Sequence, residues 1–268
     1  MWLVLLLVGI IIYLLCVLKQ KNDIKYKCFL LTLPTSTNRR QKFLTSHDRA
    51  VPLEIIYSVD TKNVENAKKY QHIIEPGYFK EALRMHYNRK RLRPDMTYFN
   101  MGAIGCYMGH MEFYRRCFEQ GLKYAVCFED NVIVTNTRLY DEIQSVINTL
   151  GDNFEICFFH CLSRFPDETE STDDLEKVKW ISSMKCYLIN VRNMEKYYKY
   201  YFPIDNHVDL KHEDLIARGA RVYYKDLRNY MKIDRMGRST IGHSQHHKPN
   251  YFSKQYPTAT PEVLKYGY

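Results

Sequence analysis

"LKYAVCFEDNVIVT", residues 122–135, is an apolar run that is interrupted by Glu129, Asp130 and Asn131 and then resumes. A short apolar run bounded by polar residues predicts a buried β-strand, here over 123–128. The predicted strand therefore ends in two carboxylates and an amide. Such a strand end raises the question of what these side chains bind.

Strand and helix signals alternate on both sides of this stretch. Further strands are predicted at 27–33, 53–60, 154–162 and 185–191 and in the late segment VYYKD. Helices are predicted within 34–47 and near 102–120, 138–150 and 192–202. The segment 61–99 shows one helix near 78–91, and 163–176 is predicted to be a loop. This alternation predicts an α/β domain with a largely parallel sheet and helices on both faces.

The composition limits the classes of protein that fit. The chain has 268 residues, of which 46% are hydrophobic, so it can bury a sizeable core. Lys and Arg exceed Asp and Glu by nine, which suits either a phosphate-rich partner or an ordinary basic surface. No helix-turn-helix, zinc-finger or aromatic strand motif accompanies the charge, so we do not expect a nucleic-acid partner.

Residues 2–18 are uncharged and would form a helix about 26 Å long, near the lower limit for spanning a bilayer. We predict a single-pass membrane anchor, a basic juxtamembrane linker at 19–25, a catalytic domain at 26–250 and a tail at 251–268. Lysines follow the apolar span and none precede it, which favours a cytoplasmic catalytic domain, with a luminal one as the alternative. The membrane of a host or a virion is a further possibility if the protein is viral.

The eight cysteines are scattered and form no CxxC pair, which predicts reduced core thiols. The segment CFFHC, residues 157–161, resembles a zinc-binding cluster. Alternate side chains of a strand point to opposite faces, however, so these two cysteines and the histidine are not expected to converge on one ion.

The acidic strand end has two explanations. In open α/β sheets, ligands bind beyond the carboxyl ends of the strands. Glu129, Asp130 and Asn131 supply oxygen ligands suited to a divalent ion such as Mn²⁺ or Mg²⁺ that bridges a diphosphate. Alternatively, the acids cap the following helix or pair with a surface lysine.

The helix near 102–120 carries two apolar rows at helical spacing, so it is predicted to be buried over much of its surface. The second row contains Ala103, Cys106, His110, Phe113 and Cys117. His110 in such a row is more often a core histidine than a ligand, and we keep it as a secondary site residue.

Several ordered motifs resemble glycosyltransferase family 25, the lipooligosaccharide and procollagen sugar transferases. "LLTLPTSTNRR" matches the first strand and its arginine-containing segment, "GAIGCYMGH" matches a Gly-x-x-Gly-Cys-x-x-Ser-His block, and "FEDN" matches a Glu-Asp-Asp block. Downstream, "CYLINVRNMEKYY", "FPIDNHVD" and "RMGRSTIG" match later segments. Two residues depart from the family pattern: Gly109 stands where the family has Ser, and Asn131 stands where it has the second Asp. The amide carries no charge, so weaker ion affinity is expected.

The resemblance implies a GT-A-like, Rossmann-type nucleotide-sugar domain behind the anchor. It implies an inverting transfer of a hexose, galactose or glucose, from a UDP-sugar to a hydroxyl group on a glycan or a hydroxylated protein. Asp130 would act through the metal ion, and Glu129 and Asn131 would hold the ion or the ribose. Gly105 and His110 lie in the matched glycine block and are expected near the donor.

Two further groups of residues are expected to contribute. Arg39 or Arg40 would bind the nucleotide's phosphates or base. If the segment after Pro203 is helical, Asp205, Asp209 and His212 share one face and offer a catalytic base, although Asp205 is equally suited to capping that helix. A late metal ligand from "GHSQHH", residues 242–247, is a weaker possibility.

A second class of function also fits the sequence. Asn131 would mark the loss of metal chemistry in a catalytically inactive binding module that keeps the glycosyltransferase fold. Nucleotide-sugar hydrolysis with and without Mn²⁺ distinguishes the two classes.

Overall fold

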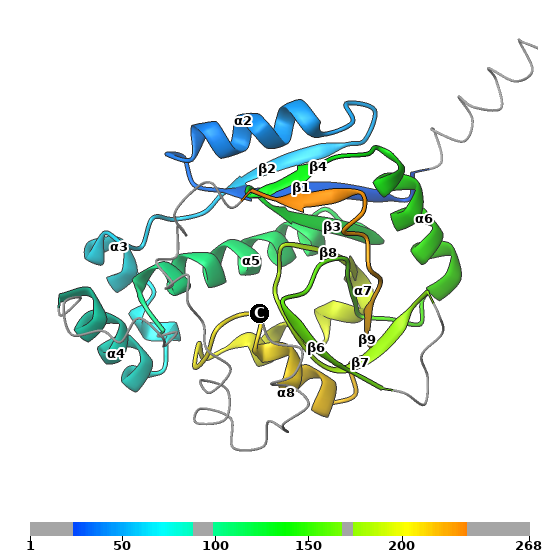
Figure 1. Ribbon diagram of the computed structural model, residues 1–268. Coiled ribbons are helices and arrows are strands. Elements are labelled where there is room, and N and C mark those ends of the chain that lie inside the picture. The colour runs from blue at the N-terminus through cyan, green and yellow to red at the C-terminus, as the bar shows by residue number, and fades with distance from the viewer. Residues whose placement is uncertain (1–23, 88–98, 168–173, 235–268) are drawn as a thin grey trace, which may run out of the picture.

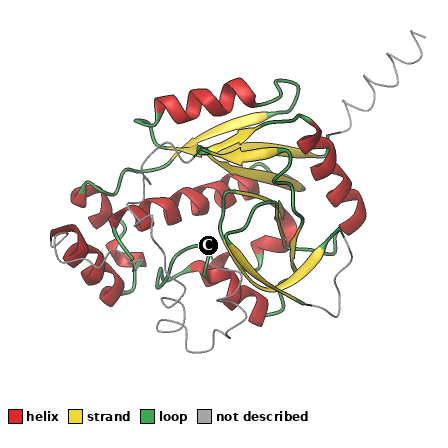
Figure 2. Cartoon of the chain, in the orientation of Figure 1, coloured by secondary structure: helices red, strands yellow, loops and turns green. Residues whose placement is uncertain are grey.

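The computed structural model of the chain describes residues 24–87, 99–167 and 174–234. Its main element is an eight-stranded mixed sheet in the order β2-β1-β3-β8-β5-β9-β7-β6, with helices on both faces (Figures 1 and 2). The strands are β1 (Tyr26–Thr32), β2 (Leu53–Tyr57), β3 (Tyr124–Glu129), β5 (Ile156–Phe158), β6 (Ser163–Pro166), β7 (Glu176–Ser182), β8 (Cys186–Asn190) and β9 (Val222–Tyr224). A separate antiparallel pair joins β4 (Val132–Val134) to β10 (Met231–Ile233).

Seven α-helices and two 3₁₀ turns lie among the described residues. The helices are α2 (Thr37–Ser46), α3 (Val64–Lys68), α4 (Pro76–Tyr87), α5 (Met101–Glu119), α6 (Arg138–Leu150), α7 (Val191–Glu195) and α8 (Lys211–Ala217). The turns are η1 (Gln71–Ile73) and η3 (Tyr198–Tyr201). The Asn100 side chain caps α5 by accepting a hydrogen bond from the Ala103 backbone N–H, which satisfies one of the free donors at the helix start.

The strand quoted at the outset, β3, lies near the middle of the sheet. It runs parallel to β1 and antiparallel to β8. All of its residues from Tyr124 to Phe128 are buried, because helices cover both faces of the sheet here. That double coverage explains why the sequence is a continuous apolar run rather than an alternating one.

The two faces of β3 belong to two different apolar clusters. Cys127 faces the cluster that contains α5 residues such as Phe113, and Phe128 faces the cluster that contains Phe43 of α2 together with the buried side of α6. Since successive side chains of a strand alternate, Glu129 continues the α5 side and Asp130 continues the α2 side.

Most predicted elements are confirmed, with differences in the second half of the chain. The sheet is mixed rather than largely parallel, because β8 and β7 run antiparallel to their neighbours. The segment 61–99 contains α3, η1 and α4 instead of one helix, and the predicted loop at 163–176 includes β6. The predicted helix at 192–202 is divided into α7 and η3.

The segment directly after Pro203 is not helical, so the condition that would place Asp205, Asp209 and His212 on one helix face is not met. Residues 203–210 are irregular, and α8 begins only at Lys211. Ile204 forms a bridge with Ile74, which holds the start of this segment in an extended conformation beside η1. Asp205 therefore caps no helix.

The predicted anchor at 2–18 and tail at 251–268, and nearly all of the linker at 19–25, lie outside the described residues. Within the described part of the chain, none of the helices has the length and apolar character required to cross a bilayer.

Candidate functional site

The predicted site lies at the edge of the sheet where β1 and β3 end. The two strands are parallel with Leu31 opposite Glu129, so Thr32 and Asp130 follow side by side at this edge. The antiparallel β8 starts at the same place, where the backbone N–H of Glu129 donates to the carbonyl of Lys185 at 2.9 Å. Side chains from three strands therefore meet where α/β sheets usually bind ligands.

Asp130 faces α2 and is nearly buried, with 9% of its surface exposed. The Thr32 hydroxyl donates to its Oδ2 at 2.8 Å, and Nη1 of Arg39 lies 3.5 Å from its Oδ1. Burial raises the pKa of the Asp130 carboxyl above its ordinary value, and the Thr32 bond and the Arg39 charge offset only part of that effect. Asp130 is thus a carboxyl with little exposed surface and a cation within reach.

Glu129 faces α5 and has a different set of partners. The Lys185 ammonium lies 2.5 Å from its Oε2, and Nε2 of His110 lies 3.7 Å from its Oε1. Burial by itself would raise the pKa of this carboxyl, but Lys185 and His110 outweigh it and hold the pKa well below the usual range. Glu129 is therefore a permanent negative charge at neutral pH.

The three predicted metal ligands are not gathered around one point. Glu129 and Asp130 turn to opposite faces of the sheet, toward Lys185 and Arg39 respectively. The side-chain oxygen of Asn131 is buried and has no hydrogen-bond partner within the described ranges, while its backbone carbonyl accepts from the N–H of Asp234. This arrangement does not fit a single hard ion held by all three side chains.

A second group of potential ligands forms on the α5 side. Cys106, His110 and Glu129 each offer one ligand atom, and these atoms all lie within 4.8 Å of one another. His110 is fully buried, as expected for the apolar row, but only one of its ring nitrogens has a hydrogen-bond partner in the described structure. His110 is therefore a core histidine that retains one unused nitrogen beside the site.

Gly105 and Gly109 place α5 close to the loop after β2. A Cβ on Gly105 would lie 2.5 Å from the hydroxyl of Thr61 and 2.6 Å from the carbonyl oxygen of Val59, and one on Gly109 would overlap the hydroxyl of Ser58. Only glycine permits this approach. The close contacts of Gly105 are thus with the Thr61 side chain and the Val59 backbone, and its predicted role in donor binding stays a prediction.

The two predicted arginines of α2 have different surroundings. Arg39 reaches Asp130. Arg40 instead donates to the carbonyls of Leu33 and Pro34 and lies over the ring of Tyr57. Only Arg39 is brought to the acidic strand end by a direct contact.

Asp205 and Asp209 are also separated. Asp205 is 41% exposed and pairs with the ammonium of Lys211 at 2.6 Å. Asp209 is partly buried, and its charge acts on Cys106 and Lys185, after the larger effect of burial on the pKa of each. Asp209 therefore lies on the Glu129 side of the site.

His212 lies just beyond Asp209 and is fully buried in α8. Its Nδ1 lies 2.7 Å from the Asp209 carbonyl, so this nitrogen carries the proton and donates. Burial lowers the pKa of His212 to about 4, so the ring is neutral at physiological pH. His212 thus fixes the turn that carries Asp209.

Sequence reasoning missed several polar residues of this edge: Thr32, His160, Ser183 and Lys185. Lys185 is the first residue of a predicted strand, and its antiparallel direction, which the sequence did not indicate, brings it to Glu129. Burial and the positive charge of Lys185 lower the pKa of His160 to about 4. Ser183, whose hydroxyl lies 3.4 Å from His160, has a φ of 114°, a strained value for a residue with a side chain.

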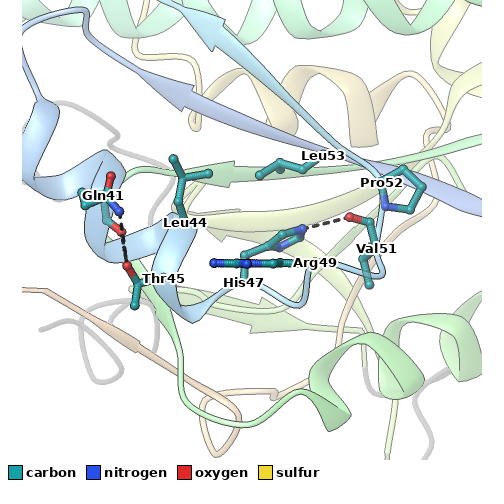
Figure 3. A pocket seen from close by; sticks show the side chains of 8 residues that line it. All are labelled: Gln41, Leu44, Thr45, His47, Arg49, Val51, Pro52 and Leu53. Atoms are coloured by element: carbon teal, nitrogen blue, oxygen red, sulfur yellow. Dashed lines mark hydrogen bonds between the residues drawn. The ribbon is translucent and has the colours of Figure 1, made fainter.

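A hollow of about 470 Å³ lies elsewhere, at the opposite edge of the sheet (Figure 3). It is lined by Gln41, Leu44, Thr45, His47, Arg49, Val51, Pro52 and Leu53. These residues belong to α2 and to the segment leading into β2, so the hollow lies near the amino end of β2. It is separate from the acidic strand end.

Comparison with known proteins gives three findings. Among solved structures, a UDP-glucose pyrophosphorylase from Acinetobacter baumanii is 9% identical, covers 90% of this chain and 97% of its own, and has a TM-score of 0.43. A mannose-1-phosphate geranyltransferase from Thermus thermophilus is 9% identical, covers 75% of this chain and 73% of its own, and has a TM-score of 0.32. No curated protein sequence gives a significant match. The model of glycosyltransferase family 25 (LPS biosynthesis protein) matches residues 25–211, which include every residue of the site from Thr32 to Asp209.

Proposed function

The chain belongs to glycosyltransferase family 25 and is a glycosyltransferase, and from this premise we propose that it moves a hexose, galactose or glucose, from a UDP-sugar to a hydroxyl group of a glycan or a protein. The proposal includes a GT-A-like donor domain and inversion at the anomeric carbon. The observation that carries it is the meeting of Asp130, Glu129, Arg39 and Lys185 at the carboxyl edge of the sheet.

The departing UDP needs positive charge beside it. As the bond from the anomeric carbon to the diphosphate breaks, negative charge grows on the leaving oxygen, and fixed cations near that oxygen lower the barrier. Arg39 and Lys185 are the two cations that contact the acidic strand end within the described part of the chain. Each is held by a carboxylate, which orients the cation without a cost at the moment of reaction.

The attacking hydroxyl needs a base within hydrogen-bond reach. Asp209 is the better candidate of the two predicted aspartates, because it is partly buried and its backbone carbonyl is held by buried His212, whereas Asp205 already has an ion-pair partner. Asp205 is engaged by the Lys211 ammonium, and 41% of its side chain is exposed. We therefore assign the proton transfer to Asp209 and a structural ion pair to Asp205.

Mn²⁺ or Mg²⁺ stays a prediction for this site. If present, such an ion would offset charge on the diphosphate. Glu129 and Asp130 face different cations, so the three predicted ligands do not act as one set.

The test is release of UDP by the purified protein. UDP-galactose and UDP-glucose are each supplied with and without acceptor, in Mn²⁺ and in a chelator, and UDP is measured over time. Turnover by the native protein that is lost on Asp130→Asn supports the proposal. Silence under all conditions, combined with a thermal shift by a nucleotide sugar, identifies the catalytically inactive binding module instead.

We further propose that residues 2–18 anchor the enzyme in a membrane with the catalytic domain on the cytoplasmic side. The support is the uncharged span followed by Lys19, Lys21, Lys25 and Lys27. Retention of the full chain in alkali-washed membranes, and release of a chain that lacks residues 2–18, is the expected result. Glycosylation of an acceptor sequence placed in the tail would indicate the luminal alternative.

A further inference from the structure

Cys106, His110 and Glu129 form a side-chain cluster, of which the proposed glycosyl transfer uses only Glu129. Cys106 and His110 lie one turn apart on α5, so their side chains share one face of the helix. Glu129 ends β3, which packs against that face (Figure 1). One sulfur, one nitrogen and one oxygen atom from the three side chains all lie within 4.8 Å of one another.

The His110 ring has an unused nitrogen that points at this cluster. Its side chain is only 1% exposed, its Nδ1 lies 2.8 Å from the hydroxyl of Tyr187, and its Nε2 has no hydrogen-bond partner among the described residues. Buried polar atoms are nearly always paired, so an unpaired one calls for an explanation. Nε2 lies 3.7 Å from Oε1 of Glu129, too far for a hydrogen bond and close enough for a shared ion.

The Tyr187 hydroxyl pairs with Nδ1 in either tautomer of His110, and the tautomer with the proton on Nδ1 leaves a lone pair on Nε2. When Nδ1–H donates to the Tyr187 hydroxyl, the neutral ring presents Nε2 as an acceptor. Two acceptors then face each other across a buried gap, the imidazole nitrogen and the Glu129 carboxylate. A cation between them converts this repulsion into two bonds.

The donor atoms select the kind of cation. Hard ions such as Mg²⁺ and Ca²⁺ bind sets of oxygen atoms, whereas a set of sulfur, nitrogen and oxygen suits zinc. Zinc bonds of about 2.0–2.3 Å place tetrahedral ligand atoms about 3–4 Å apart. The separation of His110 from Glu129 already falls in that range, and small side-chain rotations bring Cys106 into it.

The surroundings supply the supporting contacts that metal sites use. Tyr187 orients the imidazole, and Lys185 holds the second oxygen of Glu129 at 2.5 Å, which leaves Oε1 for a metal. The net formal charge of Glu129, Lys185 and Asp209 is negative by one. A divalent ion bound with the Cys106 thiolate adds one positive charge, so the net formal charge of the group becomes zero.

We propose that Cys106, His110 and Glu129 bind one zinc ion, with the fourth position open to water or to a substrate oxygen. On binding, the thiol of Cys106 loses its proton to solvent and its sulfur bonds to the metal, while the imidazole and carboxylate bond through existing lone pairs. The ion ties α5 to the end of β3 and adds positive charge beside the transfer site. This site shares only Glu129 with the predicted Mn²⁺ or Mg²⁺ site, and it differs in its other two ligands and in its metal.

The test measures metal in the purified full-length protein. About one equivalent of zinc per chain is expected by elemental analysis. Replacement of zinc by Co²⁺ should give intense thiolate-to-cobalt absorption in the near ultraviolet and visible bands typical of tetrahedral cobalt. Cys106→Ser should remove the thiolate band, and His110→Gln should lower zinc affinity by more than about tenfold.

Two further variants separate ligation from structure. Cys117→Ala removes another buried cysteine of α5 that lies outside the cluster, and it should keep full zinc content and the cobalt spectrum. Tyr187→Phe removes only the hydroxyl that orients His110, and it should lower affinity about 10- to 100-fold. Absence of zinc from the native protein at micromolar free zinc, or a cobalt spectrum without a thiolate band, overturns the proposal even if the ligand variants fail to fold.

Discussion

Glu129 and Asp130 are adjacent in sequence but belong to two different regions of the molecule. Glu129 lies on the α5 side, paired with Lys185 and close to His110, and its pKa is held low. Asp130 lies on the α2 side with Arg39, and burial raises its pKa. Because side chains alternate along a strand, these two neighbouring acids have pKa values that are shifted in opposite directions. A motif of consecutive acids is therefore not a single cluster of ligands merely because it is continuous in sequence.

The largest effect is expected on the α2 side. Asp130→Asn keeps the shape and the Thr32 contact but removes a carboxylate that both orients Arg39 and is the predicted ligand of the divalent ion, so turnover should fall about 10²- to 10³-fold. Stability should change by less than about 1 kcal/mol, because a partly desolvated charge is removed. Initial rates of UDP release and urea unfolding measure the two quantities. A large loss of stability would show that Asp130, like Glu129, has a structural role, and it would contradict the assignment of different roles to the two acids.

On the α5 side, substitution of a charged residue should affect stability more than turnover. Lys185→Met leaves Glu129 charged and unpaired, which should lower the free energy of unfolding by about 2–3 kcal/mol. The figure is below that of a fully buried pair, because Lys185 and Glu129 are 21% and 17% exposed. Chemical denaturation measures it, with Lys68→Met, which breaks a solvent-exposed pair with Glu65, as a control that should change nothing. Equal values for the two variants would contradict the assigned role of the pair.

The α5 side also depends on close packing that the α2 side does not need. Gly105→Ala would place a methyl group 2.6 Å from the Val59 carbonyl, a backbone atom that cannot rotate away. We expect a loss of about 1–2 kcal/mol in unfolding free energy. Gly77→Ala is the matched control, since its new methyl would meet only the flexible carboxylate of Glu75, and alanine favours the helix. Tolerance of alanine at Gly105 would show that α5 can shift without harm.

The first half of the sheet could be predicted from the sequence, and much of the second half could not. The strands at 27–33 and 123–128 and the helix at 102–120 are long apolar patterns, and each matches an observed element. The direction of β8 was not accessible, because strands on either side of a covered sheet are equally apolar whichever way they run. The irregular segment at 203–210 has no local signal, since the bridge from Ile204 to Ile74 is a long-range contact.

The difference between local patterns and long-range contacts also explains which site residues could be predicted from the sequence. The acidic strand end was found because its residues are consecutive, whereas Lys185 was missed because only the antiparallel pairing brings it there. Two cysteines and a histidine fall within five residues at 157–161, where alternate side chains of the predicted strand point to opposite faces. Cys106 and His110, four apart on one helix row, were a detectable pair, but Glu129 completes the set only in three dimensions.

A pH series sharpens the contrast between the two acids. The lowered pKa of Glu129 means that its contribution to stability is fully present above about 4.5, the ordinary value for glutamate, and is lost as pH falls toward the folded value. The stability gap between the native protein and Glu129→Gln should therefore narrow below pH 4.5, by at most about 1.4 kcal/mol per unit. Asp130 acts in the opposite sense, but it is present in both proteins and cancels. Urea midpoints from about pH 6 to about pH 3 provide the measurement, and a constant gap would refute the low pKa.

The smallest effect concerns the two arginines of α2. Arg39 touches Asp130, so Arg39→Gln should lower turnover about fivefold, which is about 1 kcal/mol of transition-state stabilisation. Arg40 is occupied by the carbonyls of Leu33 and Pro34 and by the ring of Tyr57, so Arg40→Gln should leave turnover nearly unchanged. Because the two residues are adjacent on one helix and carry the same charge, the pair controls for net charge and for helix propensity. Equal losses would mean that long-range positive charge, and not the contact with Asp130, is what the donor phosphates require.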